Sequence, residues 1–309
     1  MLEQGIEVHV LHFSSVFASA ASRREGQPLA VRVAERLGVP ITVEDVTEEL
    51  LALVQNPRHG HGSGMNPCID CRIMELRRAR RLMDQVGAKF VVTGEVVGQR
   101  PMSQRRFTLR LIEREAGLEG LVVRPLCALA LEPSIPEKEG WVDRERLRGF
   151  AGRQRTPQMA LAAQFGITDY PEPAGGCRLT EPGYARRIAD LRDHGELNLA
   201  NVALLDVGRH FRLAAGAKLV VGRDGPENER IERLAAPADL LLVARDYAGP
   251  TALARGAYDE DLVRLAARIT VRYGQGRAEA RVVVTVSGAR SAELMVSPAS
   301  DAGLDALRV

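Results

Sequence analysis

The chain has 309 residues, of which 45% are hydrophobic, so it is long enough for two domains and apolar enough for packed cores. It contains no run of about 18 apolar residues, and its first residues lack the basic and apolar segments of a signal peptide. We therefore expect a folded protein without a membrane span, located in the cytoplasm. The formal net charge of +2 is close to neutral.

Apolar runs bounded by turn residues alternate with segments of helical periodicity in the first 95 residues. This alternation is typical of βαβ units, in which helices cover both faces of a parallel sheet. The sequence therefore predicts an α/β fold with a Rossmann-like parallel sheet, whose ligands bind outside the carboxyl ends of the strands. The expected strands are residues 6–13, 39–46 and 89–95, and the expected helices are residues 28–37, 47–54 and 70–86.

The loops and the second half of the chain differ in periodicity from the first 95 residues. Residues 55–66, QNPRHGHGSGMN, lack periodicity, so we expect a loop over the ligand edge of the sheet. Two short helices at 144–150 and 157–165 and a helix at 184–192 complete the first domain, for which we predict residues 1–195. Residues 200–309 read as a smaller α+β domain, because short strand-like runs alternate there with turns and with helical stretches at 227–234 and 258–273.

Four cysteines are the main candidates for chemistry. In a reducing compartment they are more often metal ligands, catalytic thiols or buried fillers than disulfides. Cys177 follows the glycines of Ala174–Gly176, which allow close backbone approach and favour a working thiol. Cys127 lies in an apolar run, so we expect it to be a buried filler.

Cys68 and Cys71 form a CxxC pair just before the predicted helix, whose N-terminus would stabilise a thiolate. Three uses remain open. Structural zinc would also need His59 or His61 together with Cys177. Three cysteines that leave one iron without a protein ligand would suit an iron–sulfur cluster able to bind an extra sulfide. A redox pair would carry a persulfide on one cysteine and resolve it with the other.

The segment VVTGEVVGQ ends an apolar strand with two glycines and a carboxylate. Gly94 and Gly98 would let main-chain amides approach a nucleotide, and Glu95 would bind a ribose hydroxyl or a metal; an ordinary turn is the alternative. Residues 72–106 hold nine basic residues against three acidic ones, which indicates either phosphate contacts or a solvated face. The tetrapeptide SQRR at 103–106 lies at the same sheet edge and could also hold phosphate.

The segments TGEVVGQ, SQRR and GLVVRPL resemble the nucleotide-binding core of the 4-thiouridine tRNA sulfurtransferases (ThiI-like), which belong to the PP-loop ATPases of the adenine-nucleotide α-hydrolase type. NPCIDC and the later GGC resemble the paired cysteines of this group and of the 2-thiouridylases (MnmA-like). The resemblance covers about residues 5–193. It implies that ATP, with Mg²⁺, adenylates a tRNA uridine and that sulfur then replaces AMP, with a cysteine desulfurase as the usual donor.

The same resemblance implies the roles of individual residues. Cys68, Cys71 and Cys177 would handle sulfur as a persulfide or as ligands of an iron–sulfur cluster. The nucleotide-side residues would be Thr93, Gly94, Glu95 and Gln99.

The segment LVVGRDGPENERIERL and the strand-turn DLLLVARDYAGP resemble the RNA-binding module of the NFACT ribosome-associated proteins, over about residues 200–275. This second resemblance implies binding rather than catalysis. We therefore expect RNA contacts at Arg223 and Asn228, in addition to contacts at Arg105 and Arg106 in the first domain.

PP-loop enzymes carry an SGGxDS-type loop between the first strand and the first helix, and the chain as given lacks this segment. Residues 1–5 read as the end of an amphipathic helix with Gly5 as its C-cap, so we favour a start assigned too far downstream. If the chain truly lacks the loop, adenylation is not expected and an exposed sheet edge would cost stability. The leading hypothesis is an ATP-dependent tRNA thiolase. The alternatives are an ATP-independent sulfur carrier and a non-catalytic RNA-binding protein.

Overall fold

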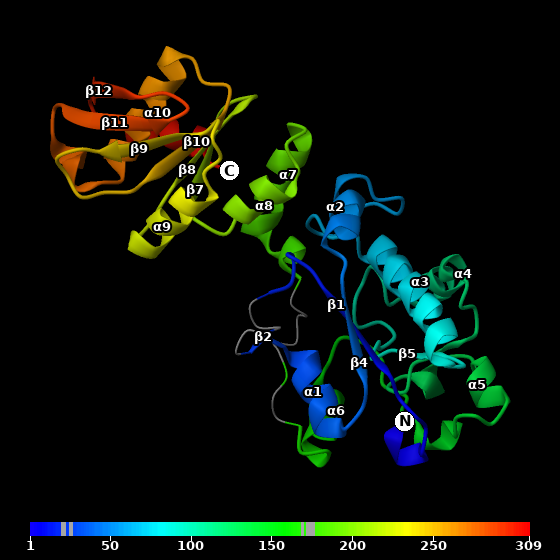
Figure 1. Cartoon of the computed structure of the whole chain (residues 1–309). Helices are drawn as coiled ribbons and strands as arrows, with labels where there is room; N and C mark the ends of the chain where they lie inside the picture. The colour runs from blue at the N-terminus through cyan, green and yellow to red at the C-terminus, as the bar shows by residue number, and fades with distance from the viewer. Residues whose placement is uncertain (20–22, 25–26, 168–169, 171–176) are drawn as a thin grey trace. The chain divides into compact units, whose positions relative to one another are not determined.

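A computed structural model describes residues 1–19, 23–24, 27–167, 170 and 177–309 (Figure 1). These residues divide into two units, Met1–Glu181 and Pro182–Val309. The sequence placed the helix now labelled α7 (Pro182–Asp193) at the end of the first domain, whereas the structure counts it with the second unit. The reason is a buried ion-pair network between Asp190 of α7 and the sheet of the second unit.

The first unit alternates strands and helices, which confirms the predicted α/β class. Its strands are β1 (Val10–Ser14), β2 (Arg23–Arg24), β3 (Gln27–Pro28), β4 (Ile41–Asp45), β5 (Val91–Val92) and β6 (Val122–Val123). Its α-helices are α1 (Leu29–Leu37), α2 (Thr47–Gln55), α3 (Cys68–Val86), α4 (Arg106–Ala116), α5 (Ile135–Lys138) and α6 (Thr156–Gln164), and its 3₁₀ helices are η1 (Leu2–Gln4), η3 (Ala128–Ala130), η4 (Arg144–Arg146) and η5 (Arg178–Thr180).

The parallel strands of the first unit form two separate pairs. β1 pairs with β4, with Val10 opposite Ile41, and β5 pairs with β6, with Val91 opposite Val122. A cavity of about 1330 Å³ is lined by residues of β1 and β5 but, among the residues that the structure describes, by none of β4 or β6. Within the described part of the chain, the cavity therefore borders the edges of β1 and β5 that face away from β4 and β6.

Helices α3 and α4 pack against each other and supply the core beside the second strand pair. In α3, Ile69, Ile73 and Leu76 follow helical spacing, so they lie on one face of the helix. They pack with Ile112 of α4 and Val122 of β6. Helix α4 was not predicted from the sequence, although its apolar residues also recur every three or four positions.

The second unit is a six-stranded antiparallel sheet with helices, as predicted for an α+β domain. The strand order is β12-β11-β9-β10-β8-β7. The strands are β7 (Arg209–Ala214), β8 (Ala217–Val221), β9 (Leu240–Ala244), β10 (Ala252–Gly256), β11 (Val282–Gly288) and β12 (Ala292–Val296). The helices after α7 are α8 (Leu199–Leu204), α9 (Gly225–Leu234), α10 (Glu260–Arg272), η6 (Gln275–Ala278) and α11 (Asp301–Leu307).

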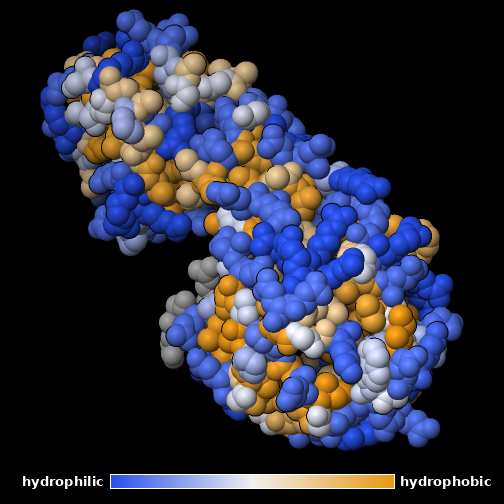
Figure 2. Space-filling view, turned by 45° about the vertical axis from the view of Figure 1, so that its right-hand side comes forward, coloured by the Kyte–Doolittle hydropathy of each residue, from blue (hydrophilic) through white to orange (hydrophobic). Residues whose placement is uncertain are grey.

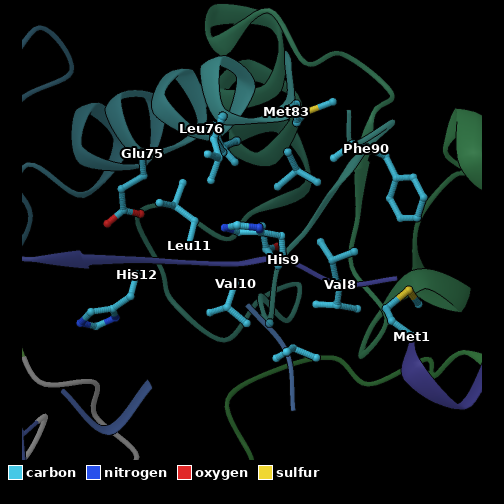
Figure 3. Close-up of a pocket in the computed structure, with 18 of the residues that line it drawn as sticks. Met1, Val8, His9, Val10, Leu11, His12, Glu75, Leu76, Met83 and Phe90 are labelled. Carbon is cyan, nitrogen blue, oxygen red and sulfur yellow. The ribbon is translucent and has the colours of Figure 1, made fainter. Parts of the chain in front are cut away.

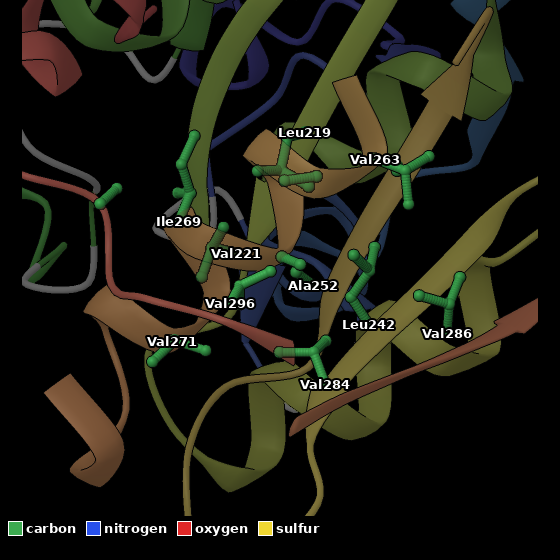
Figure 4. Packing of buried hydrophobic residues seen from close by; sticks show 14 of the residues in the cluster. Leu219, Val221, Leu242, Ala252, Val263, Ile269, Val271, Val284, Val286 and Val296 are labelled. Atoms are coloured by element: carbon green, nitrogen blue, oxygen red, sulfur yellow. The ribbon is translucent and has the colours of Figure 1, made fainter. Parts of the chain in front are cut away.

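The main core of the second unit lies between the sheet and α10. Val263 and Ile269 of α10 pack against inward-facing sheet residues such as Leu242 and Val284 (Figure 4). A second cluster, which includes Ile231 of α9, packs helices α8 and α9 against the sheet. Throughout the part of the chain that the structure describes, no helix is long and apolar enough to cross a membrane.

Candidate functional site

The CxxC pair lies inside the first turn of α3, because the helix begins at Cys68 rather than near Asp70. The Asp70 carboxylate is buried and accepts hydrogen bonds from the His59 main-chain N–H at 3.0 Å and from the His59 ring Nδ1 at 2.9 Å. The loop predicted over the sheet edge is thus anchored to the start of the helix that carries the thiols.

The third thiol is brought to the same place by a main-chain contact. The Met65 N–H donates to the Leu179 carbonyl at 3.0 Å, which ties the segment before α3 to the segment after Cys177. Cys71 interacts electrostatically with both Cys68 and Cys177. The three thiols singled out by sequence therefore lie together. Ala174–Gly176, whose glycines drew attention to Cys177, lie outside the described residues.

The sulfurs of Cys68 and Cys71 each have a polar side-chain neighbour. The Asn66 side-chain amide donates to the Cys68 Sγ at 3.0 Å, and the Cys71 thiol donates to the Glu75 Oε1 at 3.6 Å. Burial, followed by the Glu75 carboxylate, raises the pKa of Cys71 well above its usual value. Burial also raises the pKa of Cys177 to about 11. The raised pKa of Cys71 is opposite to the lowering expected from the helix N-terminus, because burial and the Glu75 carboxylate disfavour the thiolate.

The described residues contain no group of three or more His, Cys, Asp or Glu side chains arranged to hold a metal ion. The His59 ring also contacts the Glu115 carboxylate at 3.2 Å, and the His61 Nε2 lies 2.8 Å from the Val54 carbonyl oxygen. Both histidines considered for zinc thus have other partners. The three thiols, as placed, do not fit a preformed zinc or iron–sulfur site, so a cluster stays a prediction.

None of the three thiols lines the cavity, but Glu75, which accepts the hydrogen bond from the Cys71 thiol, does. Figure 3 shows Leu76 of α3 over β1, and Glu75 of the same helix near the carboxyl end of this strand. Val86 and Val92 line the cavity and are exposed, so it opens to solvent. Figure 2 accordingly shows hydrophobic residues interrupting the hydrophilic surface of the first unit, the body with the grey atoms.

Most of the predicted nucleotide residues reach this cavity. Gly98 does not line it in the structure. The Gly98 backbone has a φ of 80°, its N–H donates to the Gln104 carbonyl, and an added Cβ would lie 3.4 Å from the Gly152 nitrogen. Gly98 therefore permits close packing of two loops. The predicted residues that do line the cavity are Thr93, Gly94, Glu95 and Gln99.

Glu95 is 3% exposed and serves first as an ion-pair anchor. Its Oε2 accepts hydrogen bonds from the Arg124 Nε at 3.0 Å and from the Thr93 hydroxyl at 3.1 Å. Its Oε1 lies 3.5 Å from the Arg72 Nε and, among the described residues, has no hydrogen bond. The predicted contact of Glu95 with a ribose or a metal therefore rests on Oε1 alone.

Arg105 and Arg106 lie at the start of α4 and outside the cavity. Both side chains are exposed and stand next to Phe107, which is 74% exposed. Exposed arginines beside an exposed aromatic ring suit the phosphates and bases of single-stranded nucleic acid. Phe107 was not among the predicted residues, although its position directly after the two arginines was a usable signal.

The predicted RNA residues of the second unit have partners within that unit. The Arg223 guanidinium pairs with Glu227 at 2.6 Å. The Asn228 Oδ1 accepts a hydrogen bond from the Thr251 N–H at 3.0 Å, so Asn228 holds the loop before β10 against α9. RNA contact through Arg223 and Asn228 remains a prediction and would require these contacts to be shared or exchanged.

Comparison with known proteins gives two family matches. Residues 1–135 match the family described as thiamine biosynthesis protein (ThiI), and residues 208–307 match the NFACT protein RNA-binding domain. The ThiI match ends before Cys177. No curated protein matches the chain.

Among solved structures, the C-terminal part of the fibronectin/fibrinogen-binding protein from Streptococcus suis is 11% identical, with a TM-score of 0.30. That alignment covers 77% of this chain and 99% of the other. The two family matches agree with both resemblances read from the sequence. Residues 1–135 are therefore similar to the ThiI family, and residues 208–307 are similar to the NFACT RNA-binding domain.

Proposed function

We propose that this protein is an ATP-dependent tRNA sulfurtransferase that makes thiouridine through a cysteine persulfide. One observation carries the proposal. Cys177 lies near the distant CxxC pair of Cys68 and Cys71, and the Cys71 thiol contacts Glu75, which lines a large cavity, in a protein that also matches an RNA-binding domain. A cysteine desulfurase is the proposed source of sulfur and tRNA is the proposed substrate.

The cavity has room for a nucleotide, because small-molecule sites usually occupy roughly 300–1,000 Å³ and this one measures about 1330 Å³. Thr93, Gly94 and Gln99 would hold the nucleotide, since they line the cavity without being committed to ion pairs. When bound with Mg²⁺, ATP would supply the leaving group for the uridine carbonyl oxygen. The position of Glu75 near the carboxyl end of β1 supports chemistry at that end of the cavity (Figure 3).

The thiols would transfer sulfur in two steps. The terminal sulfur of a Cys177 persulfide forms a bond to the uridine carbon as the activated oxygen leaves. The Cys71 sulfur then attacks the Cys177 Sγ, forming a disulfide and breaking the bond to the transferred sulfur, which remains on the base as the thiocarbonyl. Glu75 accepts the Cys71 proton in this step, because the thiol already donates to its Oε1. A cellular thiol reduces the disulfide, and the desulfurase reloads Cys177.

The raised pKa values of the Cys71 and Cys177 thiols are compatible with these two transfer steps. Cys71 and Cys177 are protonated at neutral pH, so they resist unwanted alkylation and oxidation until a persulfide or a base changes their state. A persulfide is more acidic than a thiol, so loading Cys177 produces an anionic nucleophile without a change of pH.

The direct test is the thiouridine content of tRNA after incubation with the anaerobically purified chain, ATP and a persulfide donor. Cys177→Ser should form no thiouridine but bind tRNA as the wild type does, and Cys71→Ser should stop after one equivalent or fewer. Cys127→Ala is the matched control, because this thiol is buried and donates to the Glu95 carbonyl away from the other three. Undiminished thiouridine in Cys177→Ser would contradict the mechanism.

The second candidate is a non-catalytic RNA-binding protein, which the match of residues 208–307 to an RNA-binding domain favours. Pyrophosphate release from ATP in the presence of unmodified tRNA separates the two candidates. Release that depends on tRNA supports the sulfurtransferase. Tight tRNA binding without release and without thiouridine supports the binding protein.

A further inference from the structure

Two arginines from separate loops meet at the polar end of the cavity. The Gly152 N–H donates to the Val97 carbonyl at 2.9 Å, so the loop after β5 and the loop before α6 run side by side. The positive φ of Gly98 and the absence of a side chain there permit this approach. As a result, Arg100 from one loop and Arg155 from the other line the same cavity.

The charges at this end of the cavity do not balance. Arg72 pairs with Glu75 at 2.6 Å and lies 3.5 Å from Glu95, so the nearby carboxylates are already matched. Within the described residues, no carboxylate forms an ion pair with the guanidinium of Arg100 or Arg155. Burial, followed by the charge of Arg100, lowers the pKa of Arg155, so the two cations are close enough to repel each other.

One arginine of the pair, Arg100, also lies close enough to a thiol to influence it. Arg100 acts electrostatically on Cys177, so a guanidinium that lines the cavity is close enough to influence this sulfur. Guanidinium groups bind phosphate through paired N–H donors, and an anion placed between two such groups turns their repulsion into attraction.

We propose that Arg100 and Arg155 form a phosphate-binding corner of the cavity, which holds the phosphates of a nucleotide. This inference rests on the proposed function, because that function places a nucleotide in the cavity. A nucleotide is favoured over the RNA backbone since both side chains are half-buried and line the cavity, whereas the exposed Arg105 and Arg106 lie outside it.

The experiment measures the binding of inorganic pyrophosphate and of ATP to the full chain by calorimetry. Arg100→Gln and Arg155→Gln should each weaken pyrophosphate binding at least about tenfold, or about 1.4 kcal/mol. Arg153→Gln is the matched control, because Arg153 is exposed two residues away and does not line the cavity. It should bind as the wild type does.

Folding of the variants is checked without ligand. Removing one of two repelling charges should leave the melting temperature unchanged or raise it, so a loss of binding cannot be attributed to unfolding. A wild-type chain that does not bind pyrophosphate, or an Arg155→Gln chain that binds it normally, would overturn the inference. Unchanged pyrophosphate binding with weaker tRNA binding in Arg155→Gln would assign the corner to the RNA backbone and overturn the nucleotide assignment.

Failure of this inference and failure of the proposed function have different signatures. If the wild type binds pyrophosphate through both arginines but makes no thiouridine, the result supports the phosphate-binding corner and contradicts the proposed sulfurtransferase function. If thiouridine forms equally in the wild type and in Arg155→Gln, with normal pyrophosphate binding in both, the result supports the sulfurtransferase function and contradicts the phosphate-binding corner.

Discussion

Asp190→Asn tests whether helix α7 is a structural part of the second unit. The Asp190 carboxylate is 9% exposed and accepts hydrogen bonds from the Arg212 Nε at 3.0 Å, the Arg212 Nη2 at 2.8 Å and the Lys218 Nζ at 2.8 Å. Burial alone would raise the pKa of Asp190, but the hydrogen bonds from Arg212 and the charge of Lys218 outweigh it and hold the pKa below its usual value.

The magnitude follows from what the substitution leaves behind. Removing one partner of a buried ion pair costs roughly 3–5 kcal/mol, because the other charge stays buried. Arg212 keeps a second carboxylate, Glu196, at 2.8 Å, whereas Lys218 is 5% exposed and loses its only ion pair that the described structure contains. We therefore expect the lower end of the range, about 3 kcal/mol.

Urea unfolding of the full chain, followed by circular dichroism, measures this loss, and hydrogen exchange of the α7 amides shows whether the helix detaches first. Asp193→Asn is the control, because Asp193 lies on the same helix but is 57% exposed. It should change stability by no more than about 0.5 kcal/mol. The carboxylate stabilises the fold above its unfolded pKa of about 4, so the difference should shrink as the pH falls below that value. Equal stability of the two variants at pH 7 would refute the reasoning.

Three further outcomes are expected. Phe107→Ala should weaken binding of single-stranded RNA by roughly 1–3 kcal/mol, measured by fluorescence anisotropy, whereas Leu129→Ala, another exposed apolar residue, should not. Burial, followed by the charges of neighbouring basic side chains, lowers the pKa of His210 well below its usual value. Its neutral form is therefore required, and the free energy of unfolding should be roughly 2 kcal/mol lower at pH 5 than at pH 8, a difference that His210→Gln should remove. The rate of Cys177 alkylation, followed by mass spectrometry, should rise with a midpoint near pH 11; a midpoint near that of a free thiol would contradict the burial.

The sequence predicted the elements that rest on local patterns. Helices α1, α2, α9 and α10 lie close to their predicted ranges, because apolar periodicity and capping residues are local. Cys127 is confirmed as a buried residue, since its apolar neighbours are visible in the sequence. The boundary near α7 could not be placed, because it depends on ion pairs between Asp190 and residues more than twenty positions away.

The candidate site was predictable in its thiols but not in their surroundings. Glu75 could have been identified, because it lies four residues after Cys71 and therefore on the same helix face. Arg124, the ion-pair partner of Glu95, could not have been identified from the sequence, since it reaches Glu95 only through the register of β5 with β6. Arg155 had no signal at all, because it depends on the path of a loop.

Among the described residues, the edges of β1 and β5 that face away from β4 and β6 give the cavity main-chain groups that side-chain substitutions do not change. In a parallel pair each strand directs alternate N–H and C=O groups toward its free edge, and here that edge borders the cavity. A bound molecule therefore meets main-chain donors and acceptors as well as the side chains of the lining. An alanine scan of β1 would leave these groups in place and underestimate how much the strand contributes to recognition, whereas proline at a single position would delete a donor outright.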